Sequence, residues 1–263
     1  MSTIYAVVNQ KGGVGKTTTC VNLAAFLANF GKKVLVVDLD SQGNASSGLG
    51  VERMRVERCL YDVIIGEMSA QDAIIPSSIN GLDIIPATPK LAGADVELVD
   101  KNQREYKLKE ALECIRDKYE YILIDCPPSL SLLTVNALTA AHEVIIPIQC
   151  EYYALEGISQ LTKTLDMVKN SLNPNLKICG IVMTMYNKRT VLAEQVVEET
   201  KKHFGTKVFK TIIPRNVRLA EAPSFGQPIL FYDPGSTGAK AYEQLTQEMI
   251  SEEVFECQTL NEV

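Results

Sequence analysis

The residues best suited to chemistry stand close together near the start of the chain, in the run QKGGVGKTTT at 10–19. Glycines let successive backbone N–H groups converge on phosphate oxygens, and a helix that begins beside them adds its positive end. Lys16 has the place of a lysine that reaches the β- and γ-phosphates, and Thr17 has the place of a Mg²⁺ ligand. The run therefore predicts a site for a nucleoside triphosphate and Mg²⁺.

A strand and a helix are expected on either side of this run. The stretch 3–9 is apolar and rich in β-branched residues, as in a buried parallel strand. The stretch 17–30 has apolar residues at helical spacing, and Gly31 is a natural stop. This context favours a phosphate site over a glycine-rich turn without a ligand. The other expected members of the site are Gly12, Gly13, Val14, Gly15 and Thr18.

Lys11 distinguishes the run from the common phosphate loop, because it adds a second lysine ahead of Lys16. The run also lacks the glycine that the common pattern has five residues before Gly15. A lysine at the mouth of the loop directs a cation at the phosphates of its own subunit or of a neighbouring one. The alternative is a solvated loop lysine with no ligand.

Carboxylates follow two further apolar stretches, 33–38 and 121–126. Asp38 and Asp40 open a polar loop at 41–48, whereas Asp125 precedes two prolines that stop its strand. Open α/β sheets bind ligands at the carboxyl ends of their parallel strands. We therefore expect Thr17, Asp40 and Asp125 at the metal, with Asp125 acting through water. Asp38 lies deeper, where it has either a structural role or a contact with metal-bound water.

Strand-like and helical stretches alternate along the chain, which predicts one α/β domain with a mostly parallel, twisted sheet and helices on both faces. The other expected strands are 82–87, 143–148, 178–185 and 208–214. The other expected helices are 104–118, 130–141, 154–171 and 191–204.

Composition narrows the class of protein. The seven cysteines are scattered without a C-x-x-C pair, which favours reduced thiols over disulfides or zinc. No apolar run approaches the roughly 18 residues of a membrane span, and no signal peptide precedes the first strand, so we expect a cytoplasmic protein. The net charge is −6, yet the stretch 188–218 carries +5 and the remainder therefore −11. This basic stretch is either a polyanion-binding surface or a solvated helix face.

The loop resembles the deviant Walker A signature of the ParA/MinD family of P-loop ATPases, in which a lysine precedes the glycines. The resemblance is strongest to the small chromosomal ParA (Soj-type) partition proteins, which lack an extra N-terminal DNA-reading domain. The family's usual proline after the second aspartate is Ser41 here, a change that removes no chemical group. The resemblance spans nearly the whole chain, through VVDLDSQGN, ILIDCPPSL, PIQCEYYALEG, IPRNVRLAEAPSFGQPI and YDPGSTGAKAY.

This resemblance implies an ATPase that uses ATP and Mg²⁺ and has Lys11, Lys16 and Asp40 as its catalytic residues. Lys11 would contact phosphates across an ATP-sandwich dimer, and Asp40 would orient the attacking water. Hydrolysis would be slow without a partner, since no arginine finger is evident. Asn187, Pro214 and Asn216 would form the adenine pocket, although Asn187 could equally be a turn residue.

The resemblance further implies that ATP drives a homodimer, that the dimer binds double-stranded DNA without sequence preference, and that a ParB-type (Spo0J) protein stimulates hydrolysis and release. The protein would then be nucleoid-associated. Arg189 and Arg218 match positions that contact DNA in Soj-like proteins, and Lys188, Arg215 and Lys240 are added by proximity and charge. Phosphate contacts of this kind are salt-sensitive and independent of sequence.

Two rival functions use the same scaffold. A MinD-like membrane ATPase would need a basic amphipathic C-terminal helix, whereas the stretch 251–263, SEEVFECQTLNEV, is acidic. We therefore expect no membrane partner, with an ATPase domain at 1–255 and an acidic tail at 256–263. A metabolic enzyme, such as an amide-ligating synthetase or an electron-transfer iron protein, is the second rival. The iron protein would need a cluster cysteine, and Cys126 lies too close to Asp125 to fit.

Overall fold

The computed structural model describes residues 2–151 and 154–260. Within them, one eight-stranded sheet has the order β3-β4-β2-β5-β1-β6-β7-β8. Neighbouring strands are parallel except for β3 and β4, which pair antiparallel. The strands are β1 (Thr3–Val7), β2 (Val34–Asp38), β3 (Ile75–Pro76), β4 (Leu82–Ile85), β5 (Tyr121–Asp125), β6 (Glu143–Gln149), β7 (Lys177–Tyr186) and β8 (Val208–Pro214).

Both faces of the sheet are buried, which explains why its strands are apolar throughout rather than alternating with polar residues. In β1, Ile4 and Ala6 belong to the core on one face, whereas Tyr5 and Val7 belong to the core on the other. Side chains that point to opposite faces thus both leave water, so a run of apolar residues is what this position requires.

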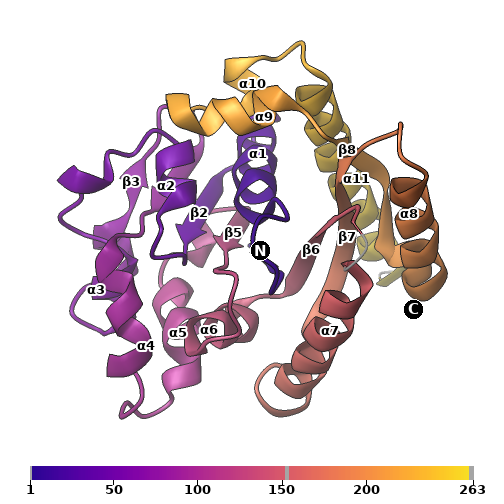
Figure 1. Ribbon diagram of the computed structural model, residues 1–263. Coiled ribbons are helices and arrows are strands. Elements are labelled where there is room, and N and C mark those ends of the chain that lie inside the picture. Colours follow the sequence, from indigo (N-terminus) through magenta and orange to yellow (C-terminus); the bar gives the residue numbers. More distant parts are fainter. Residues whose placement is uncertain (1, 152–153, 261–263) are drawn as a thin grey trace.

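Helices cover the two faces as separate layers (Figure 1). One layer contains α1 (Lys16–Asn29), α2 (Asn44–Gly48), α9 (Val217–Glu221), α10 (Ile229–Tyr232) and α11 (Thr237–Leu260). The opposite layer contains α3 (Leu60–Ile64), α4 (Ala94–Glu97), α5 (Lys107–Glu113), α6 (Leu132–Ala140), α7 (Ala154–Ser171) and α8 (Val191–Phe204). The predicted α/β class, with a mostly parallel sheet covered on both faces, is confirmed.

One predicted helix was wrong in its extent. The stretch 104–118 forms only the seven-residue α5, between short 3-10 turns at Arg104–Tyr106 and Arg116–Lys118. Asn136 of α6 explains the break at the start, because its side chain donates a hydrogen bond to the Arg104 carbonyl and accepts one from the Leu108 N–H. These bonds satisfy backbone groups that a continuous helix would otherwise have paired internally.

Several short helices were not anticipated from the sequence, and neither were strand β3 and the long helix α11. β3 is a two-residue antiparallel strand at the edge of the sheet. α11 is a helix of 24 residues that continues to Leu260, so the division between a domain and a tail at residue 255, which stays a prediction, falls within a helix. Among the described residues no helix combines the length and the apolar character that a membrane span needs.

Candidate functional site

The phosphate loop lies between β1 and α1, as predicted, and two of its glycines adopt a backbone conformation that other residues resist. Gly13 has φ +74° and Gly15 has φ +91°, both in the left-handed region. Gly15 caps the N-terminus of α1, and its carbonyl accepts the first helical hydrogen bond, from the Thr19 N–H, at 2.8 Å. The helix therefore begins directly at the loop, with its unpaired N–H groups facing a ligand.

Two buried polar residues that sequence reasoning missed hold the loop in place. Asn9 donates to the Pro147 carbonyl of β6 at 2.8 Å and accepts from the Lys11 N–H at 3.0 Å. Thr184 of β7 donates from its hydroxyl to the Val14 carbonyl at 2.8 Å. Both are polar residues near the ends of otherwise apolar strands, but this pattern in the sequence does not identify the groups that they hold.

Lys16 points inward. Its side chain is buried, and Nζ donates to the carbonyl of Lys11 at 3.2 Å, so the loop wraps its own lysine. Burial lowers the pKa of Lys16, while the nearby Asp125 carboxylate acts in the opposite direction. Thr17 and Thr18, the next residues of α1, remain partly exposed. The buried ammonium of Lys16 would be better compensated by an anion than by the Lys11 carbonyl. A polyanion that binds beside the partly exposed Thr17 and Thr18 hydroxyls could replace this carbonyl as its partner.

Asp125 is fully buried at the end of β5, between β1 and β2, and is in register with Val7 and Asp38. Among the residues that the structure describes, none forms a hydrogen bond of good geometry with either carboxylate oxygen. Burial, followed by the charge of Asp38, raises the pKa of Asp125 well above its ordinary value, whereas the Thr17 hydroxyl and Lys16 oppose this rise. An orphaned buried carboxylate is a poor structural group, yet it fits a hydrated Mg²⁺.

Asp38 and Asp40 have different surroundings although they are two residues apart. Buried Asp38 accepts hydrogen bonds from the Ser46 N–H at 2.8 Å and the Ser46 hydroxyl at 2.6 Å. Burial raises the pKa of Asp38 to about 6, against the effect of these bonds. Asp40 is partly exposed and accepts from the Gln42 N–H at 2.9 Å. Asp38 thus anchors α2, which lies within the expected loop 41–48. The side chain of Asp40, in contrast, remains partly accessible to solvent.

The side chain of Lys11 is partly exposed and has a different partner from that of Lys16. Its Nζ lies 3.3 Å from Oε2 of Glu151, and 38% of the Lys11 side chain is exposed. Gly12 and Gly13 are exposed as well, and a methyl group on Gly12 would lie 3.9 Å from Cβ of Pro128. The two lysines of the loop are therefore separated, one facing inward and one outward.

The expected adenine residues lie together at the ends of β7 and β8. Tyr186 pairs with Pro214, and the Arg215 N–H donates to the Tyr186 carbonyl at 2.9 Å. Asn187 accepts from the Arg189 N–H at 3.1 Å, which makes it the turn residue that the sequence allowed. Asn216 caps α9 by accepting from the Arg218 N–H at 2.8 Å. Both side chains thus already have local structural roles.

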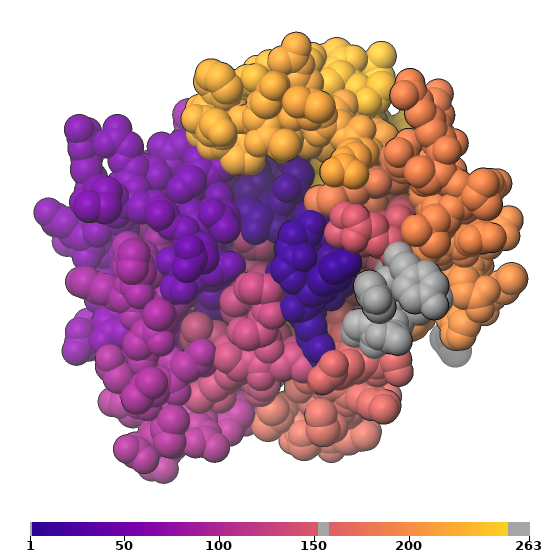
Figure 2. Space-filling view, viewed as in Figure 1, coloured from indigo at the N-terminus to yellow at the C-terminus, as the bar shows by residue number. Residues whose placement is uncertain are grey.

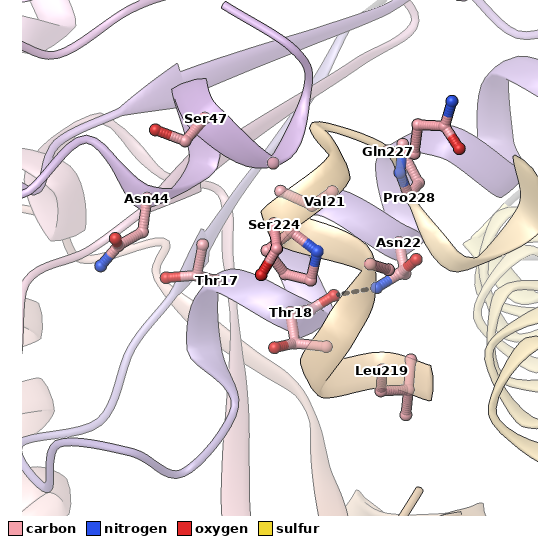
Figure 3. Close-up of a pocket in the computed structure, with 13 residues that line it drawn as sticks. Thr17, Thr18, Val21, Asn22, Asn44, Ser47, Leu219, Ser224, Gln227 and Pro228 are labelled. Carbon is pink, nitrogen blue, oxygen red and sulfur yellow. Dashed lines mark hydrogen bonds between the residues drawn. The ribbon is translucent and has the colours of Figure 1, made fainter. Parts of the chain in front are cut away.

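A cavity that sequence reasoning missed borders the phosphate loop (Figure 3). It has a volume of about 420 Å³ and lies between α1, α2 and the segment that joins α9 to α10. Thr17 and Thr18 line one side, where Asn22 donates to the Thr18 carbonyl at 2.8 Å. Ser224 and Gln227, from the segment between α9 and α10, also line the cavity.

The expected DNA contacts are all exposed near the same edge of the sheet. Lys188, Arg189 and Arg215 form no ion pair with any other part of the chain that the structure describes. Arg218 differs, because it lies 2.9 Å from a carboxylate oxygen of Glu221 and 3.4 Å from one of Asp233. Its charge is thus compensated within the subunit, in contrast to those of its neighbours.

Comparison with known proteins agrees with this geometry. A family model described as an AAA domain matches residues 2–178. The Bacillus subtilis sporulation initiation inhibitor protein Soj is 57% identical, over 95% of this chain and 98% of its own length. The Caulobacter vibrioides chromosome partitioning protein ParA is 52% identical, over 95% and 94%.

A solved structure shows the same fold with ligands. The Mycobacterium smegmatis cobyrinic acid a,c-diamide synthase, with bound ADP and magnesium, superimposes with a TM-score of 0.83 at 36% identity, over 94% of this chain and 93% of that one. Its name matches the amide-ligating rival, but its identity to this chain is well below that of Soj and ParA. The chain therefore belongs to the ParA/Soj family of P-loop ATPases.

Proposed function

We propose that the protein is an ATP-dependent chromosome-partitioning ATPase. The observation that carries the proposal is the phosphate loop with its two separated lysines, one buried beside an unpartnered carboxylate and one at the surface. The partitioning role rests on the 57% and 52% identity to Soj and ParA over nearly the full length of both. A MinD-like membrane ATPase finds no comparable support among these relatives.

The residues of the loop have distinct tasks in this proposal. The backbone N–H groups of 12–15 bind phosphate oxygens, and Lys16 exchanges the Lys11 carbonyl for a phosphate. Thr17 and Asp125 hold Mg²⁺, directly and through water, while Thr18 supports the α-phosphate. Bound Mg²⁺ would offset the charge that develops on the phosphates. Asp40 is exposed enough to orient the attacking water, and the turns at Asn187, Pro214 and Asn216 enclose the base.

Lys11 requires a second subunit in this account. Because it faces outward beside exposed Gly12, two copies related by a two-fold axis can each direct Lys11 at the other's nucleotide. The cation arrives only after dimerisation, and no arginine finger is evident in the chain, so we expect hydrolysis to stay slow until a partner protein acts on the dimer. Phosphate release measured on purified protein checks this, and turnover near 1 s⁻¹, the low end for enzymes, would contradict it.

The dimer would present its basic residues to DNA at the nucleoid. Lys188, Arg189 and Arg215 have no internal counter-ion among the described residues, so DNA phosphates can take that place, and a dimer doubles their number. To contact DNA, Arg218 would have to break its ion pairs with Glu221 and Asp233 and pair with a phosphate instead. A ParB-type partner would then stimulate hydrolysis and release the dimer.

Salt dependence tests the DNA contacts. Arg189→Glu should lower the slope of log affinity against log salt by at least about 1.8, since each lost phosphate contact removes about 0.9 and the dimer loses two. Lys207→Glu is the matched control. Lys207 is also exposed and belongs to the basic stretch, but it precedes β8 and therefore lies at the amino end of the strand, away from the expected DNA contacts at the carboxyl ends. An unchanged slope for an Arg189→Glu dimer would remove the arginine from the interface.

A further inference from the structure

Glu151 follows β6 and is the counter-ion of Lys11. Its Oε2 lies 3.3 Å from the Lys11 ammonium, and its Oε1 accepts a hydrogen bond from the Gln149 amide at 2.6 Å. The carboxylate is thus oriented by two donors, one on each oxygen. An oriented carboxylate fixes where the lysine ammonium rests, instead of leaving it to sample solvent.

The two lysines of the loop are held by groups of different strength. Lys16 donates to a neutral carbonyl, which a phosphate oxygen displaces readily because the phosphate is charged. Lys11 donates to a full negative charge, so a phosphate must compete with an existing ion pair to recruit it. The loop can therefore bind nucleotide through Lys16 while Lys11 remains paired within its own subunit.

We propose that Glu151 is the positioning residue of Lys11, and that it restrains the lysine in its own subunit until a second nucleotide-bound copy offers its phosphates. This inference rests on the proposed function, in which Lys11 acts across a dimer. Glu151 then sets the protein concentration at which ATP produces dimers. Because the dimer is two-fold symmetric, two Lys11–Glu151 pairs break for each dimer that forms.

The size of the effect follows from the exposure of the pair, 38% for Lys11 and 51% for Glu151. Exposed ion pairs change equilibria by up to about fivefold each. Because two pairs break per dimer, Glu151→Gln should lower the dissociation constant of the dimer by about two- to 25-fold.

Amine labelling tests the Lys11–Glu151 ion pair in the nucleotide-free protein, so the test does not require a dimer. The nucleotide-free protein is treated with a limiting dose of acetic anhydride, and modification at Lys11 and at Lys32 is counted by mass spectrometry. Lys32 lies 3.0 Å from Glu120 in a pair of similar exposure, 35% and 47%, at the opposite end of the sheet. Glu151→Gln should raise labelling of Lys11 alone, and Glu120→Gln should raise labelling of Lys32 alone.

Sedimentation velocity then measures dimerisation with ATP and Mg²⁺, in an Asp40→Ala background that slows hydrolysis. Glu151→Gln should tighten the dimer relative to Asp40→Ala alone, and Glu120→Gln should leave it unchanged. Unchanged Lys11 labelling overturns the proposal, as does increased labelling with an equal or weaker dimer. If the Asp40→Ala parent stays monomeric, the proposed function fails, and the labelling result still decides whether Glu151 holds Lys11.

Discussion

Asp125 is the residue that most clearly separates function from stability. A buried carboxylate that no donor contacts in good geometry among the described residues destabilises the protein that carries it, because it loses its hydration and gains little in exchange. Asp38, its neighbour in register, shows the contrast, since Ser46 supplies it with two donors. The sequence keeps one of the two carboxylates unsatisfied, at the position where a Mg²⁺ site is expected.

We predict that Asp125→Asn raises the free energy of unfolding of the nucleotide-free protein by about 1–3 kcal/mol, because the amide occupies the same space without a buried negative charge beside Asp38. The same change should abolish Mg²⁺-dependent hydrolysis. Burial raises the pKa of Asp125 in the folded state above its unfolded value, so its contribution to stability declines as pH rises. The gain from Asp125→Asn should thus be larger at pH 7.5 than at pH 5.

Urea denaturation of the nucleotide-free protein measures this gain, and Asp83→Asn is the control. Asp83 accepts a hydrogen bond from the Tyr119 hydroxyl at 2.7 Å, so its replacement should bring no gain. A loss of stability on Asp125→Asn would show that the carboxylate is a structural group.

At the scale of elements, α2 is coupled to the segment after α9 by a close backbone approach. Gly226 has φ +63°, and a methyl group there would lie 2.9 Å from Cα of Gly50, just past α2. The same α2 segment contains Ser46, which binds Asp38. The loop at 41–48, which contains α2, and the Gly50 that follows it are thus packed directly against the part of the chain that follows Arg218 of α9.

We predict that Gly226→Ala lowers the free energy of unfolding by at least about 1 kcal/mol more than Gly31→Ala does. Both glycines have positive φ, so both changes introduce backbone strain of about 1–2 kcal/mol. Only Gly226 has backbone atoms in the way, whereas no atom lies within 4 Å of a methyl group on Gly31. Equal losses in urea denaturation would show that the approach to Gly50 is unimportant.

The sequence predicts elements well where burial alone determines them. The buried strands were recognisable because both of their faces require apolar residues, and β7 and β8 match the expected ranges within one residue at each end. β3 is too short to show a period, and α5 is shortened by bonds from Asn136, which is distant in sequence. Such tertiary hydrogen bonds leave no local pattern.

The candidate site likewise contains residues that the sequence predicts and residues that only the structure identifies. The loop, Asp40 and Asp125 could be proposed as site residues from the sequence, because their residue types and spacing suit phosphate and metal chemistry. The supports of the loop, Asn9, Thr184 and Glu151, could not be assigned beforehand, because their partners Pro147, Val14 and Lys11 are far away in sequence.

At the scale of the whole molecule, one edge of the sheet carries every expected functional group. The N-terminal segment, indigo in Figure 2, reaches the surface at the centre of the face shown, between the purple and orange parts of the chain. The carboxyl ends of β1, β2 and β5 supply the phosphate loop and the aspartates, and those of β7 and β8 supply the basic residues. The proposed nucleotide and DNA sites therefore lie on the same side of the subunit, where one proposed dimer interface could affect both.

The central claim is that ATP determines whether a DNA-binding dimer exists. Size-exclusion chromatography of Asp40→Ala, with and without ATP and Mg²⁺, tests it most directly when each peak is then mixed with duplex DNA for a gel shift. The account predicts a monomer without ATP that leaves DNA unshifted, and a dimer with ATP that shifts it. A monomer under both conditions, or a DNA shift that does not depend on ATP, would contradict the account.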